Sequence, residues 1–189
     1  MRKRLIIITG VGDYDRLFRF FAHIWELYGF ETHIGAFVWE DAASTFEPKM
    51  ARLLSDIDAT KPGGSLYIIG VSAGGTAAIH ALAARPEAVT KVVTLCSPLK
   101  TMPDLRNPLL QESIAALPAS FAALSDAARH KILSVYAAKD DIVKPSLSQV
   151  PGLRTYRLFT SGHGFTIFAG MTIFSFPIRK FFRGQLREG

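Results

Sequence analysis

Two hydrophobic patterns follow one another along the chain: short apolar runs, and longer segments with an apolar residue every three or four positions. The short runs lie at residues 5–9, 31–39, 66–71, 89–96, 132–138 and 154–159, and each has the length of a buried strand. Between them, residues 16–28, 48–58 and 77–84 have the spacing or composition of helices. This alternation with short links predicts an α/β fold: a doubly wound, mostly parallel six-stranded sheet with helices on both faces.

Composition indicates a single compact domain over residues 1–189. The chain is 49% hydrophobic and 20% charged, which supplies enough apolar material for a sizeable core. Its net charge of +6 is spread along the chain until the tail, and no nucleic-acid-binding motif is present, so we expect no nucleic-acid partner. The single cysteine, Cys96, excludes an internal disulfide and fits a reducing compartment.

The N-terminus imitates a secretory signal, because a basic start at residues 1–4 precedes an apolar run. That run is too short for a signal peptide and ends without a cleavage site, so we interpret it as the first strand of the sheet. No apolar stretch reaches the length of about 18 residues that a membrane span needs. We therefore expect a cytoplasmic protein.

One motif carries chemistry. The apolar run at residues 66–71 meets Gly70-Val71-Ser72-Ala73-Gly74, and a small-residue helix follows. A Gly-x-Ser-x-Gly sequence between a strand and a helix predicts a sharp turn that exposes the serine at the edge of a sheet. Gly70 and Gly74 would provide the space that lets the strand and the helix pass closely. By chance alone the pentapeptide is weak evidence, but its place between strand and helix strengthens it.

Ligand sites in parallel sheets lie at the carboxyl ends of the strands, and this rule sorts the five histidines. His23 and His80 fall inside helices, and His33 and His130 fall at or before strand starts. Only His163, between two glycines, directly follows a strand. The other interpretation of His163 is a loop histidine that bonds to backbone.

The serine and histidine, with an acid between them in the chain, resemble the α/β-hydrolase superfamily, and its small lipases and esterases without a large cap in particular. The resemblance covers nearly the whole chain. It implies Ser72 as nucleophile, His163 as base and Asp140 as acid, the last from the spacing of Asp140 to Val143. Asp141 is the alternative acid, and the other aspartate would then cap a turn or helix.

The resemblance also implies an oxyanion hole and a substrate pocket. The N–H groups of Ala73 and Val11 would bind the oxyanion, although Thr9-Gly10 stands where the superfamily usually has His-Gly. Gly10, Pro98 and Leu99 would border the substrate.

The stretch 100–130 lies where the superfamily inserts caps and is expected to form only a helix and a short flap. Cys96 is interpreted as a packing residue.

A dinucleotide-binding loop is a competing interpretation of residues 9–15, because Gly10-x-Gly12 follows a strand and Glu40-Asp41 ends the next one. The third glycine of that motif is replaced by Asp15. Asp13 and Asp15 would also place negative charge where a pyrophosphate must bind.

The C-terminal segment is rich in phenylalanine and ends in basic residues, and Pro177 should divide it into two pieces. One interpretation is a closing helix packed on the sheet. The other places the piece after Pro177 beside the active-site mouth or on an anionic membrane, with phenylalanines inserted and Arg179, Lys180, Arg183 and Arg187 at the headgroups.

Together these features predict a serine hydrolase that cleaves an ester or thioester with an uncharged acyl part. The alternative is an inactive α/β-hydrolase scaffold that acts as a binding protein. We expect a small-molecule substrate, no cofactor and no metal, since one cysteine and dispersed histidines make no metal-binding motif. Sequence leaves the oligomeric state open.

Overall fold

A computed structural model describes the chain except for residues 1–2, 13, 36, 42–44, 60–63 and 187–189. Asp13 and Arg187 therefore lie outside the described residues.

Six strands form one sheet in the order β2-β1-β3-β4-β5-β6, and every neighbouring pair is parallel. The strands are β1 (Lys3–Ile8), β2 (Glu31–Gly35), β3 (Ser65–Val71), β4 (Lys91–Leu95), β5 (Ile132–Lys139) and β6 (Arg154–Ser161). The predicted parallel six-stranded sheet is confirmed. The central strands are buried on both faces, as their continuous apolar runs indicated.

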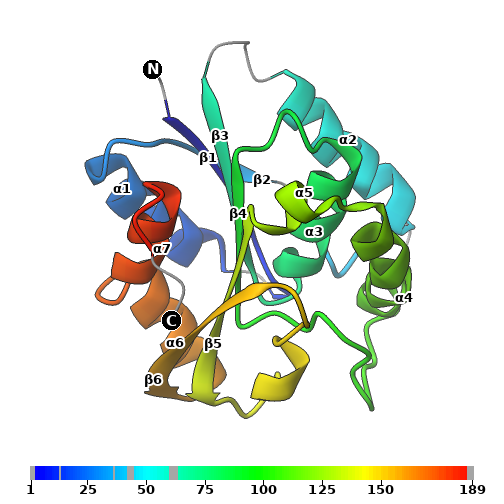
Figure 1. Cartoon of the computed structure of the whole chain (residues 1–189). Coiled ribbons are helices and arrows are strands. Elements are labelled where there is room, and N and C mark those ends of the chain that lie inside the picture. The colour runs from blue at the N-terminus through cyan, green and yellow to red at the C-terminus, as the bar shows by residue number, and fades with distance from the viewer. Residues whose placement is uncertain (1–2, 13, 36, 42–44, 60–63, 187–189) are drawn as a thin grey trace.

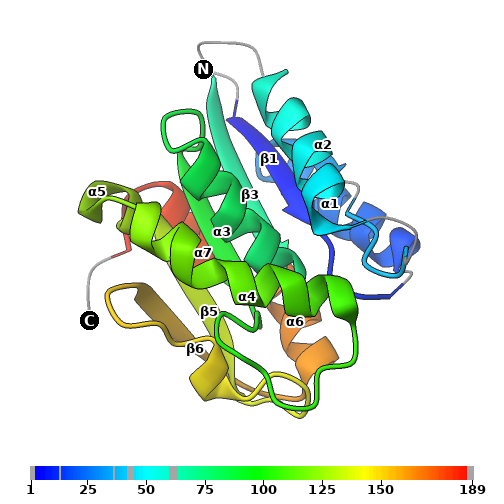
Figure 2. The same ribbon diagram turned by 90° about the vertical axis from the view of Figure 1, so that its right-hand side faces the viewer.

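Helices cover both faces of this sheet (Figure 1). The helices are α1 (Asp15–Leu27), α2 (Phe46–Asp58), α3 (Gly74–Ala84), α4 (Pro108–Ala123), α5 (Asp126–Arg129), α6 (His163–Met171) and α7 (Phe176–Phe182), with a short 3-10 turn at Pro145–Leu147. One layer contains α1, α6 and α7 and the other contains α2 to α5, as Figure 2 shows from the side of α4. Each layer encloses its own apolar core against the sheet. Among the described residues, no helix combines the length and apolar character needed to cross a bilayer.

The strand order reverses beside β1. The chain leaves β1 for β2 on one side and then crosses to β3 on the other side. Loops that leave the carboxyl ends of β1 and β3 therefore diverge and leave a crevice between them, which is where open parallel sheets bind ligands. Both Gly10 and Ser72 lie in this crevice, because they follow β1 and β3.

The strand expected over residues 31–39 ends earlier, at Gly35. Beyond the strand, the N–H of Phe37 donates to the carbonyl of Gly35 at 2.9 Å. Phe37 and Trp39 then pack ring against ring, with centroids 4.4 Å apart, in the core under α2 and α4. The strand therefore ends where the chain leaves the edge of the sheet and buries both aromatic rings.

Pro177 stands at the start of α7, and non-helical residues separate α7 from the end of α6 at Met171. The predicted division into two pieces is therefore confirmed. The phenylalanines after Pro177 are not available to a membrane, which corrects that part of the expectation. Phe181 and Phe182 are buried, and the Phe182 ring contacts the rings of Trp25 and Tyr67. The α7 helix therefore closes the core, as the first interpretation held.

Residues 100–130 contribute α4 and α5. Helix α4 begins with Asn107 as its cap, whose Oδ1 accepts from the N–H of Leu110 at 2.9 Å. It packs on α3 through a polar bridge as well as apolar contacts: His80 contacts the Ser113 carbonyl at 2.9 Å and Ser120 Oγ at 2.6 Å. A carbonyl can only accept, so His80 Nε2 carries the proton, and burial lowers the pKa of His80 and keeps it neutral.

The glycines around Ser72 make this packing possible. A Cβ on Gly70 would lie 2.4 Å from the carbonyl oxygen of Gly74, and one on Gly74 would lie 2.2 Å from the carbonyl oxygen of Ile8. Both contacts are with backbone, which cannot rotate away. The predicted close passage of strand and helix is confirmed.

We predict that Gly70→Ala lowers the free energy of unfolding by at least about 1–3 kcal/mol, because β3 and α3 must separate to admit the methyl group. Urea denaturation measures the effect. Gly164→Ala is the matched control, since a Cβ there meets nothing within 4 Å and alanine favours a helix. Equal losses of stability in the two variants would contradict the argument.

Candidate active site

Ser72 lies in the turn between β3 and α3 in a left-handed backbone conformation, with φ at 51°. A residue other than glycine pays about 1–3 kcal/mol for such a conformation, so the surrounding contacts must hold it. They do so from two sides. The N–H of Ser72 donates to the Leu95 carbonyl at 2.8 Å, and its own carbonyl accepts from Gly75 at 3.0 Å. The hydroxyl is consequently directed into the crevice at the sheet edge.

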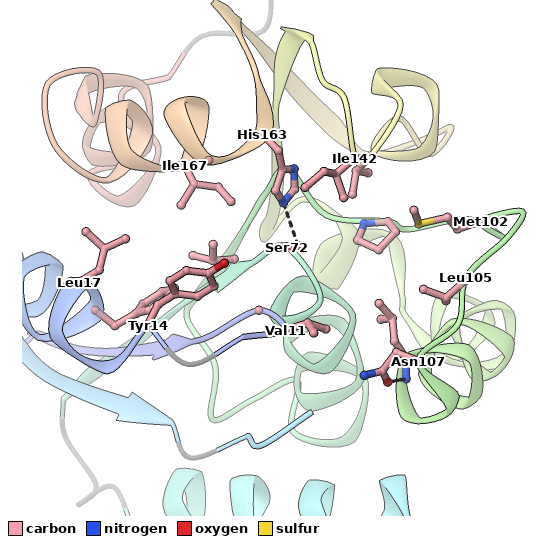
Figure 3. Close-up of a pocket in the computed structure, with 17 residues that line it drawn as sticks. Val11, Tyr14, Leu17, Ser72, Met102, Leu105, Asn107, Ile142, His163 and Ile167 are labelled. Atoms are coloured by element: carbon pink, nitrogen blue, oxygen red, sulfur yellow. Dashed lines mark hydrogen bonds between the residues drawn. The ribbon is translucent and has the colours of Figure 1, made fainter. Parts of the chain in front are cut away.

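His163 is the first residue of α6 and directly follows β6 through Gly162, which has φ at 89°. Its backbone is held by Asp141, whose Oδ1 accepts from the His163 N–H at 2.8 Å. The imidazole Nε2 lies 3.0 Å from Ser72 Oγ (Figure 3). Two residues that are 91 positions apart in the chain therefore share a hydrogen bond.

Asp140 holds the other side of the imidazole. Its Oδ2 lies 2.9 Å from His163 Nδ1, and its Oδ1 accepts from the N–H groups of Ile142 at 2.9 Å and Val143 at 2.8 Å. Burial alone would raise the pKa of this carboxyl, but these three hydrogen bonds outweigh burial and lower the pKa. The carboxylate is thus ionised at neutral pH.

An ionised carboxylate has no proton to give, so His163 Nδ1 must donate to Asp140. In a neutral imidazole Nε2 then has a free lone pair, and it accepts from the Ser72 hydroxyl. This is the tautomer that an imidazole needs in order to accept a proton from a neighbouring hydroxyl.

The two neighbouring aspartates have separate places. Asp140 contacts the ring of His163, whereas Asp141 contacts only its backbone N–H. The geometry therefore agrees with the choice of Asp140 for the ring and with a capping position for the other aspartate.

Cys96 lies directly behind this group, a placement for which the sequence held no signal. Its thiol sulfur, a carboxylate oxygen of Asp140 and a ring nitrogen of His163 all lie within 4.8 Å of one another. Cys96 directly follows β4, as Ser72 follows the neighbouring β3, and it also has a positive φ, 52°. Burial, and then the negative charge of Asp140, raise the pKa of the thiol far above its usual range, so the thiol is protonated.

These three side chains are also ligand types that zinc accepts, a grouping that the linear sequence concealed. A metal ion there would have to displace the thiol proton against burial, and it would separate His163 from Asp140.

The loop after β1 forms the opposite wall of the crevice. Gly10 lies so close to Ser72 that a Cβ on Gly10 would stand 2.8 Å from the Ser72 Cβ. The loop is held from outside the crevice: the Trp39 indole N–H donates to the Thr9 carbonyl at 2.9 Å, and Asn107 Nδ2 donates to the Trp39 carbonyl at 3.1 Å. Backbone rigidity next to the serine is what an oxyanion site requires.

The dinucleotide interpretation receives no support from this loop. The Glu40 carboxylate accepts from the N–H of Gly12 and so occupies a donor that a phosphate would need. Asp15 begins α1 and pairs with Arg19 at 2.8 Å. Negative charge therefore surrounds the position of the expected pyrophosphate.

A cavity of about 440 Å³ opens above Ser72 and His163. Gly10, Val11 and Pro98 line it, as expected, but Leu99 does not: its side chain is buried in the core beside α3 and α4. The other lining residues are Tyr14, Leu17, Phe18, Val71, Met102, Leu105, Asn107, Leu110, Ile142, Val143, Gly164 and Ile167. Among the described residues that line it, there is no aspartate, glutamate, lysine or arginine.

In Figure 3 this cavity extends to both sides of Ser72. Tyr14, Leu17 and Ile167 lie on one side, and Met102, Leu105 and Asn107 lie on the other. Both sides are apolar except for the hydroxyl of Tyr14 on one side and the amide of Asn107 on the other, and that amide already bonds to Trp39 and Leu110. Most of these residues were missed by the sequence analysis, because an apolar residue that faces a cavity has the same pattern as one that faces the core.

No protein-family model matches the sequence, and no curated protein matches it significantly. Solved structures do match. A metagenome-derived lipolytic enzyme of the LipS and LipT pair aligns with 97% of this chain and 94% of its own at 16% identity, with a TM-score of 0.70. The ydeN gene product from B. subtilis covers 96% and 99% at 16% identity, with a TM-score of 0.69. The monoacylglycerol lipase of Paleococcus ferrophilus covers 85% of each chain at 15% identity, with a TM-score of 0.61. The chain therefore has the α/β-hydrolase fold.

We predict that the Cys96 thiol does not react with a thiol reagent such as Ellman's reagent at pH 8 while the chain is folded, because it is 1% exposed and its pKa is raised. Unfolding in denaturant should release one reactive thiol. Cys96→Ser, which should give no signal in either state, is the control. Reaction of the folded chain at the rate of a free cysteine would contradict this placement.

Proposed function

We propose that the chain is a serine hydrolase that cleaves an uncharged ester or thioester through Ser72, His163 and Asp140. The observation that carries the proposal is the continuous set of hydrogen bonds from Ser72 Oγ through the His163 ring to Asp140. A serine that sits at positive φ at the mouth of a largely apolar cavity, with an imidazole nitrogen 3.0 Å from its hydroxyl oxygen, supports a nucleophile over a structural residue.

In the proposed reaction, Ser72 Oγ attacks the ester carbonyl carbon while its proton moves to His163 Nε2. The negative charge that develops on the carbonyl oxygen is bound by the N–H groups of Ala73 and Val11. Collapse of this intermediate breaks the bond to the leaving group, which takes the proton from His163. Water then repeats the sequence on the acyl-serine and releases the acid.

Asp140 has an electrostatic role in these steps. The imidazole becomes positively charged each time it accepts a proton, and the ionised carboxylate 2.9 Å from Nδ1 stabilises that charge. It also prevents the ring from turning. The chemistry requires no cofactor.

The cavity supports an uncharged substrate with apolar groups on both sides of the reacting bond. Apart from the Tyr14 hydroxyl and the Asn107 amide, its described walls are apolar on either side of Ser72, and a charged group there would lose its water without gaining a partner of opposite charge. The neighbours in fold include a lipolytic enzyme and a monoacylglycerol lipase, which agrees with ester hydrolysis but does not identify the substrate of this chain.

We predict that a fluorophosphonate probe labels the chain covalently at Ser72, and that Ser72→Ala abolishes the labelling while the far-UV circular dichroism spectrum is unchanged. Intact-mass measurement and peptide mapping detect the adduct. Ser97→Ala is a control, since Ser97 is a buried serine outside the cavity. No labelling of the wild type, or a label on another serine, would favour an inactive scaffold that only binds its ligand.

A second prediction separates the two aspartates. Asp140→Asn should lower the rate of hydrolysis of a p-nitrophenyl ester by about ten-thousand-fold, because the amide no longer stabilises the imidazolium and favours the wrong tautomer.

Asp141→Asn should have a mild effect, because the asparagine Oδ1 can still accept from the His163 N–H. The two variants differ by one position and by the same chemical change, so each controls for the other. If Asp141→Asn were the more damaging, Asp140 would not be the acid of this site.

A further inference from the structure

Besides Leu27 at the end of α1, six large apolar side chains lie partly outside the core in the layer formed by α1, α6 and α7. They are Phe20, Phe165, Phe168, Ile173, Phe174 and Phe176, each between 37% and 73% exposed, and we call them the aromatic surface. The core does not require them. Helix α1 already buries Phe18, Phe21 and Trp25, and α7 buries Ile178, Phe181 and Phe182.

The aromatic surface is continuous with the active-site cavity, because α1 and α6 run side by side in the same direction. Nearest the cavity, Leu17 in the first turn of α1 and Ile167 in the middle of α6 line the same wall. Halfway along, the Phe20 and Phe168 rings are stacked with centroids 6.4 Å apart and planes 9° apart. At the far end, the hydroxyls of Tyr28 and Ser175 lie 3.5 Å apart. Figure 1 shows α1, α6 and α7 together on this side of the sheet.

On the side of this surface formed by α6 and α7, the charge has one sign. Residues 163–186 contain Arg179, Lys180 and Arg183 and no aspartate or glutamate. The Lys180 ammonium lies 4.4 Å from the centre of the Phe176 ring, and the Arg179 guanidinium lies 4.3 Å from that of Tyr28. Two acids, Asp15 and Glu26, lie on α1, where they contact Arg19 and Thr32.

We infer that the aromatic surface binds an anionic phospholipid membrane, with its apolar side chains among the acyl chains and the cations of α7 at the headgroups. Exposed aromatic and aliphatic side chains flanked by lysine and arginine are typical of protein surfaces that lie in the membrane interface. Pairing with a second copy through the same surface would bring the three cations of each chain together and is disfavoured.

This inference rests in one respect on the proposed function. If the chain hydrolyses esters, the cavity receives its substrate from the membrane, because Ile167, which lines the cavity, is next to Phe168 of the aromatic surface on α6 and an apolar chain would have little water to cross. The substrate would then be an uncharged, lipid-soluble ester. Binding to the membrane itself does not require Ser72.

Sedimentation with vesicles tests the inference. The full chain should bind vesicles of phosphatidylcholine mixed with phosphatidylglycerol and should bind vesicles of phosphatidylcholine alone far less. Phe165→Ser combined with Ile173→Ser should reduce binding at least tenfold, since these are two of the most exposed members of the surface. Hydrolysis of the water-soluble substrate p-nitrophenyl acetate should be unchanged, because neither residue lines the cavity.

Phe159→Ser is the matched control for the aromatic surface. Phe159 is 84% exposed, but it lies on β6 next to Leu158, which packs in the core beneath α6 and α7. Successive side chains of a strand point to opposite faces, so Phe159 points away from the aromatic surface, and its replacement should leave binding unchanged.

A second pair of variants tests the charge. Arg183→Gln should weaken binding to anionic vesicles about fivefold, as expected for one basic residue near a charged bilayer. Arg52 is an exposed residue of α2 in the opposite layer, and Arg52→Gln should have no effect on binding.

Equal sedimentation with neutral and anionic vesicles, sedimentation with neither, or equal losses in Phe165→Ser/Ile173→Ser and Phe159→Ser would overturn the inference. So would a concentration-dependent dimer in light scattering that the double variant converts to a monomer, since the surface would then belong to a second copy. Failure of Ser72 to react with the fluorophosphonate probe would refute the proposed function and leave membrane binding standing.

Discussion

The close passage of β3 and α3 is the constraint on which the candidate site depends. Gly70 and Gly74 place backbone against backbone at distances that no side chain would permit, and the turn between them holds Ser72 at a positive φ. Gly75 extends the same contact, since a Cβ there would lie 2.0 Å from Ser97 Oγ. The strain at Ser72 is maintained because the strands and helices on both sides are packed and cannot relax toward it.

Buried polar groups determine the geometry around that turn. Asp140 is a charged carboxylate that is nearly enclosed, with 1% of its side chain exposed, and its four hydrogen-bond contacts with Ile142, Val143 and His163 make its burial tolerable. The same contacts orient the imidazole. A second polar set, from Thr76 through Ser113 to His80, holds α4 against α3 on the other side of the sheet. Satisfied buried groups of this kind permit one arrangement of the elements and penalise the alternatives.

The cavity and the aromatic surface share one physical origin, an excess of apolar side chains over what the two cores can enclose. On the α4 side, Met102 and Leu105 precede the helix and face the cavity, while Leu109 and Ile114 on the helix face the core. On the α1 side, Leu17 faces the cavity and Phe21 faces the core. An apolar binding site and an apolar exterior thus adjoin at α1 and α6.

Sequence alone determined the parts of this protein that depend on local pattern. Apolar runs and the helical spacing between them were enough for the six parallel strands, because strands buried on both faces must be apolar throughout. The Gly-x-Ser-x-Gly sequence predicted the turn at Ser72, since only glycines at positions 70 and 74 allow such close contact between the strand and the helix. The rule that parallel sheets place their sites at the carboxyl ends of the strands selected His163, because it is the histidine that directly follows a strand.

Only the tertiary structure decided what depends on contacts between distant segments. It separated Asp140 from Asp141, because one carboxylate reaches the ring and the other reaches the backbone of a residue more than 20 positions away. It removed Leu99 from the cavity and placed Cys96 behind the acid. It also sorted the C-terminal phenylalanines into the buried Phe181 and Phe182 and the exposed Phe165 and Phe168. In each case residues of the same chemical type can take either place, in the core or at the site. The sequence cannot separate these places, because packing between distant segments determines which neighbours a side chain contacts.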